Sequence, residues 1–284
     1  MKKALLWIIA IIITIAAAYY QRTTGPTYPR SEKIQLDDST YTVKLIRSEG
    51  SRDARVELPF QDTSVTATLF YKRFQVHEEW TLVPFVQKEI RYHSVFMKKV
   101  LGKKDHTALA AYLPQQPPAG KLEYFIEIRK NDRIVQVAHD TPVVIRFKGD
   151  VPAGVLIPHV LMMFLAMLLS TTAGLFALFK VERYKRNAIW ALAILFIGGF
   201  ILGPWVQWYA FGEWWTGIPF GWDLTDNKTL FVFIFWIAAM FGLRGKGRPW
   251  LVVLAAVMTL VIFSIPHSLF GSELNYATGA VTTG

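Results

Sequence analysis

Long apolar runs occur at the start of this chain and four times in its second half, and a polar stretch of over a hundred residues lies between them. The runs cover residues 4–20, 155–179, 188–209, 229–243 and 250–269. A helix rises about 1.5 Å per residue, so about 20 apolar residues cross a hydrocarbon core about 30 Å thick. All five runs lack lysine, arginine and carboxylates. We therefore predict an α-helical transmembrane domain of four spans over residues 151–270, preceded by an N-terminal anchor or signal peptide.

The first run has two interpretations, because its features suit both a retained anchor and a cleavable signal peptide. Lys2-Lys3 gives the run a basic start, and Ala16-Ala17-Ala18 offers small residues of the kind found at cleavage sites. The run is only just long enough to cross a bilayer. We favour a transmembrane anchor over residues 1–20, and both interpretations place the following domain outside the cytoplasm.

The polar stretch contains short segments in which apolar and polar residues alternate, as they do in half-buried strands. These segments cover residues 41–46, 55–60, 64–71, 80–86, 94–100, 107–113, 121–129, 134–138 and 143–147. Turn residues separate them at a spacing of roughly 8–12 residues, which is typical of β-sandwiches. We therefore predict an extracytoplasmic all-β sandwich over residues 41–150, joined to the first run by a linker over residues 21–40.

The clearest turn in the polar stretch is Lys130-Asn131-Asp132, which separates two alternating segments, residues 122–128 and 133–137. Asparagine and aspartate tolerate the backbone conformations of tight turns, so these segments are expected to form a hairpin. The hairpin resembles the last one of fibronectin type III and immunoglobulin-like modules. That resemblance implies an Ig/fibronectin-like fold for the β domain and carries no activity with it.

The positive charge lies mostly beside the apolar runs. The chain has a net charge of +10, and Lys2-Lys3, residues 180–187 and residues 244–248 together hold nine basic residues against Glu182. Basic loops of membrane proteins stay in the cytoplasm. We therefore place the N-terminus inside a bacterial inner (cytoplasmic) membrane, with the β domain and the C-terminal tail, residues 271–284, outside. Because membrane orientation accounts for the charge, the expected partners are the lipid bilayer and an envelope protein, and no nucleic acid.

Several kinds of chemistry are disfavoured by the residues present. The chain has no cysteine, which excludes disulfides, thiol catalysis and cysteine-ligated clusters. No lysine, arginine or carboxylate lies inside an expected span, although ion-coupled transporters place such groups deep in the bundle. His77, His93 and His106 are scattered through the polar stretch. We find no catalytic motif, and the sequence does not indicate an enzyme.

The outer membrane face carries a repeated tripeptide. Ile157-Pro158-His159 and Ile265-Pro266-His267 stand at the outer ends of the second and fifth runs, so both imidazoles are expected at a similar depth. The outer loop between these spans, together with the residues just before it, contains half of the ten tryptophans: Trp205, Trp208, Trp214, Trp215 and Trp222. One interpretation is structural, because tryptophans gather at membrane interfaces.

The polar residues that follow the loop also have a structural interpretation. Asp223, Asp226 and Asn227 precede the fourth run, and Thr225 or Asp226 is expected to cap its helix by accepting hydrogen bonds from the free amides of the first turn. The whole string Asp223-Leu-Thr-Asp-Asn-Lys-Thr229 resembles uncharacterised bacterial membrane proteins, which implies no function.

Trp214-Trp215 and Trp222-Asp223 resemble the WWD segment of the haem-handling membrane proteins of cytochrome c assembly, with residues 216–221 inserted between the two pairs. The resemblance implies haem as a cofactor, with His159 and His267 as axial ligands and with Trp214, Trp215 and Trp222 covering the macrocycle. Two imidazoles fill both axial positions of a haem, and indole rings suit its flat apolar surface. Asp223 or Lys228 would then orient the ligands or meet a propionate.

Three functions are therefore carried forward. The first is a non-enzymatic membrane scaffold whose outer β domain binds a protein, with Gly198-Gly199 and Gly203 permitting close helix packing. The second is the haem-binding protein just described. The third is an outer-face metal site built from His159 and His267 together with the carboxylates of Glu213, Asp223 and Glu273, because imidazole with carboxylate suits zinc, copper or iron.

Overall fold

The chain divides into two compact units, one helical and one built of strands. The computed structural model describes residues 2–91, 99, 102, 104–244, 247–267, 269 and 271–283. The helical unit comprises Met1–Pro26, Gly149–Glu273 and Ala280–Gly284, and the β unit comprises Thr27–Lys148 and Leu274–Gly279. The expected strand over residues 94–100 lies, except for Lys99, outside the described residues.

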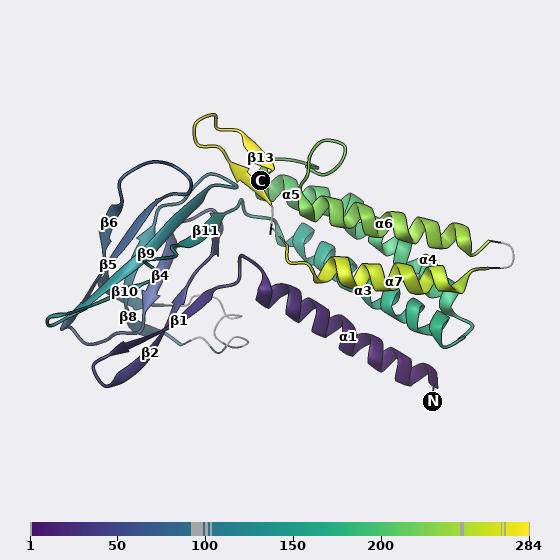
Figure 1. The fold of residues 1–284 in the computed structure, drawn as a ribbon, viewed down its shortest axis with the longest axis horizontal. Coiled ribbons are helices and arrows are strands. Elements are labelled where there is room, and N and C mark those ends of the chain that lie inside the picture. Colours follow the sequence, from purple (N-terminus) through teal and green to yellow (C-terminus); the bar gives the residue numbers. More distant parts are fainter. Residues whose placement is uncertain are drawn as a thin grey trace. The chain divides into compact units, whose positions relative to one another are not determined.

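The helical unit has the apolar helices that the sequence predicted. Its elements are α1 (Lys2–Thr24), α3 (Ala153–Leu178), α4 (Tyr184–Phe196), η1 (Ile197–Leu202), α5 (Gly203–Phe211), α6 (Leu224–Gly242) and α7 (Pro249–Ser264) (Figure 1). In the part of the chain that the structure describes, four continuous helices are long and apolar enough to cross a membrane, since α4, η1 and α5 join into one helix over Tyr184–Phe211; α7 is apolar but shorter. The expectation of a membrane protein in contact with lipid is supported.

Small residues hold the helices of this unit close together. Gly174 of α3 faces α7 so closely that a β-carbon added to it would stand 2.5 Å from the β-carbon of Ala256. Gly199 of η1 meets Thr229 of α6 at the same distance. Bilayer lipids are as apolar as the side chains, so close packing rather than hydrophobicity has to hold such helices together. The glycines expected to allow close packing therefore serve contacts within the chain, and Gly198 packs on Met162 and Met163.

The basic segments gather at one end of the helical unit. Lys2 at the start of α1 donates through Nζ to the carbonyl oxygen of Phe179, at 3.1 Å, just after α3. Lys185 at the start of α4 lies beside Gly247, between α6 and α7, with Nζ 3.9 Å from where a glycine β-carbon would stand. The contacts therefore join all three basic segments on the same side of the bundle.

Among the described residues, the β unit contains eleven strands between α1 and α3. They are β1 (Arg30–Leu36), β2 (Ser39–Leu45), β3 (Ser48–Glu49), β4 (Ala54–Leu58), β5 (Val65–Arg73), β6 (Thr81–Pro84), β7 (Val86–Ile90), β8 (His106–Leu113), β9 (Lys121–Lys130), β10 (Arg133–Val137) and β11 (Val143–Phe147). A six-stranded sheet runs in the order β3-β11-β9-β5-β6, with β10 also paired to β9. A three-stranded sheet runs β4-β8-β7, and β1 pairs only with β2.

One hydrophobic core serves all three sheets. Strands β1, β2, β4, β5, β8 and β9 each send alternate apolar residues into it, as expected for sheets with one buried face. On β9 these are Leu122, Tyr124, Ile126 and Ile128, all at most 1% exposed. Tyr124 is held in the core by its hydroxyl, which donates to the carbonyl oxygen of Ile46 at 2.9 Å.

The predicted hairpin is confirmed, and two other expectations differ from the structure. β9 and β10 pair antiparallel, with Arg133 opposite Lys130, and Asn131 takes the left-handed backbone of the turn at φ 52°. Residues 21–40 are not all linker, because α1 extends to Thr24 and β1 begins at Arg30. The expected strand over residues 80–86 is the first half of a longer extended segment that changes sheets. Phe85 is the buried residue at which β6, paired with β5, gives way to β7, paired with β8.

A short segment near the end of the chain, residues 274–279, belongs to the β unit. Two short strands, β12 (Ser272–Leu274) and β13 (Val281–Thr283), pair with each other. Leu274 donates its backbone N–H to the carbonyl oxygen of Ala119 at 3.1 Å. The Tyr276 hydroxyl accepts from the N–H of Lys121 at 3.0 Å and donates to its carbonyl oxygen at 2.8 Å. Residues 274–279 are therefore a part of the β unit that sequence alternation did not reveal.

Candidate functional site

The polar string at the start of α6 is a helix cap. Asp223 is the N-cap residue, and its Oδ1 accepts hydrogen bonds from the backbone N–H groups of Thr225 at 2.8 Å and Asp226 at 3.3 Å. Its other oxygen lies 3.5 Å from the hydroxyl of Ser272. The sequence predicted a cap at Thr225 or Asp226, and the structure moves it to Asp223. The cap satisfies amides that the first turn of any helix leaves unpaired.

Asp226 and Asn227 hold the preceding loop in place. The Oδ2 atom of Asp226 accepts from the backbone N–H groups of Thr216 at 2.6 Å and Gly217 at 3.1 Å. Oδ1 of Asn227 accepts from the N–H of Ile218 at 2.8 Å. Both side chains are buried. The loop between α5 and α6 is therefore fixed to the first turn of α6 through its backbone.

Lys228 is buried because it binds the end of another helix. Its Nζ donates to the carbonyl oxygens of Ile265 at 2.7 Å and Pro266 at 3.4 Å. Helix α7 ends at Ser264, so these carbonyls lack helical partners. A lysine near a helix C-terminus is favourable for this reason and because of the helix dipole. The side chain joins α6 to α7. These hydrogen bonds account for the burial of Lys228 without the expected contact with a haem propionate.

His159 of α3 is oriented by the π-helix η1. Its Nδ1 lies 2.9 Å from the carbonyl oxygen of Gly198, which also accepts the backbone N–H of Gly203. A carbonyl only accepts hydrogen bonds, so Nδ1 carries the hydrogen and Nε2 keeps a free lone pair in the neutral ring. This is how proteins orient histidines that ligate metals.

His267 lies near His159. It follows the end of α7, directly after the Ile265 and Pro266 carbonyls that Lys228 binds. His159 contributes to the electrostatic environment of its ring. The structure thus brings the two predicted histidines into one neighbourhood, and their sharing of a ligand stays a prediction. Among the described residues no three histidine, cysteine, aspartate or glutamate side chains are grouped so that they could hold a metal ion.

The tryptophans of this region point in different directions. Trp214 stacks on Trp208 of α5 with ring centroids 5.3 Å apart and meets Trp205 edge-on at 5.7 Å. Trp215 stacks on Phe200 of η1 and donates through Nε1 to the carbonyl oxygen of Ile218. Trp222 is 75% exposed. The three residues of the expected haem cradle are therefore placed on separate neighbours.

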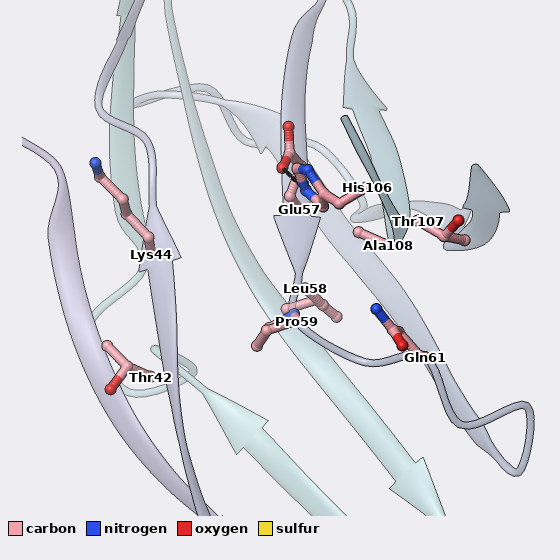
Figure 2. Close-up of a pocket in the computed structure, with 9 residues that line it drawn as sticks. All are labelled: Thr42, Lys44, Glu57, Leu58, Pro59, Gln61, His106, Thr107 and Ala108. Carbon is pink, nitrogen blue, oxygen red and sulfur yellow. Dashed lines mark hydrogen bonds and ion pairs between the residues drawn. The ribbon is translucent and has the colours of Figure 1, made fainter. Parts of the chain in front are cut away.

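The β unit has an open groove between strands β2, β4 and β8. A cavity of about 300 Å³ is lined there by Lys44, Glu57, Gln61 and His106, among others (Figure 2). Glu57 lies 2.6 Å from Nε of Arg55 and 3.3 Å from Nε2 of His106. The carboxylate is thus already paired with two basic groups.

The outer face of the six-stranded sheet carries an aromatic cluster that sequence reasoning missed. Phe125 lies on the opposite face of β9 from the core residues Tyr124 and Ile126, and its aromatic neighbours leave it only 7% exposed. It stacks on Phe70 at 4.6 Å and meets Trp80 and His139 edge-on at 4.9 Å each. Leu82, opposite Phe70 on β6, is 60% exposed. We call these five residues the aromatic face.

Comparison with known proteins returns no family model, no curated protein and no solved structure that matches this chain. Any function must therefore be inferred from the residues and their arrangement.

Proposed function

We propose that this chain is a non-enzymatic membrane scaffold whose β unit, an Ig/fibronectin-like sandwich on the outer side of a bacterial inner membrane, binds an envelope protein. The aromatic face is the observation that carries the proposal. Its members lie on one side of the six-stranded sheet, where β-branched or charged residues would suffice if the face only met water.

Aromatic residues are the side chains that contribute most to protein–protein interfaces. On the aromatic face they are already ordered by mutual stacking, which lowers the entropy lost on binding. Lys72 lies 4.9 Å from the Trp80 ring and 3.2 Å from Glu123, so charged groups border the apolar surface. An apolar centre with a polar rim is the usual anatomy of such interfaces.

The gathering of the basic segments at one end of the helical unit supports the orientation. By the positive-inside rule this end is cytoplasmic. On this proposal, the start of α3 and the β unit that precedes it lie on the outer side.

The binding proposal is tested by photo-crosslinking in cells that contain the full chain. A photoreactive phenylalanine analogue at Leu82 is expected to give a discrete adduct with another protein. The same analogue at the exposed Gln61, in the groove of the other sheet, is the control and should give none. The adduct at Leu82 should be lost in Trp80→Ala, provided that this variant keeps the parent's melting temperature. No adduct at Leu82, or equal adducts at both positions, contradicts the proposal.

The orientation is tested separately with a membrane-impermeant thiol reagent, because the chain has no cysteine of its own. In intact spheroplasts, Asn131→Cys should react and Tyr184→Cys should react only after the membrane is opened. The reverse pattern would contradict an outer β unit.

Haem binding is the second candidate, and the hydrogen bond from His159 to Gly198 favours it. That bond leaves Nε2 of His159 free as an axial ligand, with His267 nearby. The separate placements of Trp214, Trp215 and Trp222 do not resemble one cradle, so we derive no reaction through the group. Purified protein should show a Soret band that weakens in both His159→Ala and His267→Ala if this candidate holds. A colourless protein, or spectra that are unchanged in both variants, would contradict haem binding and leave the scaffold as the proposed function.

A further inference from the structure

The loop between α5 and α6 exposes large apolar side chains without any charge among them. From Trp214 to Trp222 the sequence has no charged residue. Phe220 is 82% exposed and Trp222 is 75% exposed, with Trp214 at 48%. Exposed apolar side chains of this kind mark a surface that contacts a membrane or another protein rather than water.

The backbone N–H groups in the middle of this loop are already paired within the protein. Thr216 and Gly217 donate their N–H groups to Asp226, and Ile218 donates to Asn227. Phe220 and Gly221 both donate to the carbonyl oxygen of Gly217, at 2.8 and 3.0 Å. Pro219 between them has no N–H. Irregular backbone tolerates a lipid environment only when its donors are paired within the protein, and the donors from Thr216 to Gly221 meet that requirement.

The loop also folds back along a span. Trp214 stacks on Trp208 and meets Trp205 edge-on. These two tryptophans lie one turn apart on α5, within the helix Tyr184–Phe211, and both are more than 40% exposed. Trp214 therefore joins the exposed, lipid-directed side of that helix near its end.

We propose that this loop is a membrane-interface anchor, in which Phe220 and Trp222 insert into the boundary between lipid headgroups and acyl chains. Indole and phenyl rings favour that region. Asp226 and Asn227 fix the loop backbone to the first turn of α6. Phe220 and Trp222 therefore enter the lipid as part of a rigid loop. The occupant of this surface is the bilayer itself, and the inference is independent of any partner of the β unit.

Single spin labels in the cysteine-free chain test this placement. The full chain carrying Phe220→Cys, and separately Trp222→Cys, is labelled and reconstituted in vesicles of phosphatidylethanolamine and phosphatidylglycerol. Collision rates are measured with oxygen, which concentrates in lipid, and with a nickel chelate, which stays in water. Ile234→Cys, at an exposed position of α6, is the lipid reference, and Asn131→Cys in the β9–β10 turn is the water reference.

Labels at both loop positions should collide more often with oxygen than with the nickel chelate, as the label at position 234 does. Collision rates like those at position 131 would show that the loop lies in water and would overturn the proposal. Low rates with both reagents would show that protein covers the loop, as in a dimer or over a cofactor, and would overturn it equally. Phe220 makes no buried packing that its replacement could disturb, since it is so exposed.

Discussion

Three charged side chains at the start of α6 form hydrogen bonds with backbone groups. Asp223 and Asp226 accept amide hydrogens, and Lys228 donates to carbonyls. Each therefore satisfies a helix end or a loop that lipid could not. A charge used in this way is fixed in place, which argues against its acting as a mobile proton carrier.

Tyr124 offers a test of the same principle in the β unit. Its buried hydroxyl donates to Ile46, and burial raises the pKa of that hydroxyl. Tyr124→Phe should lower the free energy of unfolding of the β unit by about 1–3 kcal/mol, because the Ile46 carbonyl loses its buried partner. Tyr112→Phe, at a half-buried ring beside Lys88, is the matched control and should change little. Equal effects in chemical denaturation would contradict this account.

Asp62 predicts how the β unit responds to acid. The backbone N–H of Ser64, then its hydroxyl and Lys130, lower the pKa of Asp62 to about 2. An unfolded aspartate has a pKa of about 3.9. The native carboxylate is thus favoured, and its contribution is present above about pH 4 and is lost as the pH falls towards 2. Melting temperatures of the parent and Asp62→Asn should differ at neutral pH and converge on acidification. A difference that persists at pH 2 would contradict the assignment.

The sequence allowed only some of the residues at the candidate site to be predicted correctly. It found His159, His267 and the polar string after the loop, because residue type and position relative to the spans are visible in sequence. It assigned the cap to the wrong residue, since Asp223, Thr225 and Asp226 are all good cap residues and only the start of the helix decides among them. The aromatic face escaped notice because Phe70, Trp80 and Phe125 are brought together by strand pairing.

At the scale of elements, the tight contact between α3 and α7 should be sensitive to mutation. Gly174→Ala would place a β-carbon 2.5 Å from that of Ala256. Overpacking of this kind costs about 1–3 kcal/mol, so the variant should melt earlier in detergent. Adding Ala256→Gly should restore most of the loss.

Gly154→Ala is the control in the same helix, because nothing lies within 4 Å of its added β-carbon. It should be neutral or slightly stabilising. Failure of the double variant to recover would show that the contact is not specific to this pair.

Helix α1 is packed as a member of the bundle. Leu6, Ala10 and Thr14 are buried, while Ile8, Ile12 and Ile15 on its other side are more than 50% exposed. Such packing predicts that the segment is retained as an anchor. Intact mass spectrometry of the protein purified from membranes should include residues 2–24. A mass that begins after Ala18 would show a cleaved signal peptide.

The elements themselves were largely predictable, and their ends were not. Apolar runs and alternation identify the spans and most strands, because burial dictates both patterns. The sequence gives no comparable signal for η1, or for the change of sheets at Phe85. The fourth run was expected from residue 229, yet α6 starts at Leu224. Asp226 and Asn227 were expected to precede this helix. They instead lie in its first turn and are buried against the loop.

At the scale of the whole molecule, the two units predict separate folding. The β unit has its own core and no cysteine, so residues 27–148 expressed alone should give a β-type circular dichroism spectrum and a cooperative melt. A disordered product would contradict the division. The same fragment extended by residues 274–279 through a flexible linker should melt at a higher temperature, because the tail pairs with Ala119 and Lys121.

The return of Tyr276 to the β unit has a consequence for the order of synthesis. Gly149–Glu273 separates the body of that unit from its tail. At about 5–20 residues per second, the ribosome needs roughly 6–25 s to translate this interval. During this interval the Lys121 edge of the nascent β unit is not yet closed by Tyr276. A protease that recognises this edge would distinguish chains whose translation is finished from those whose translation stopped early.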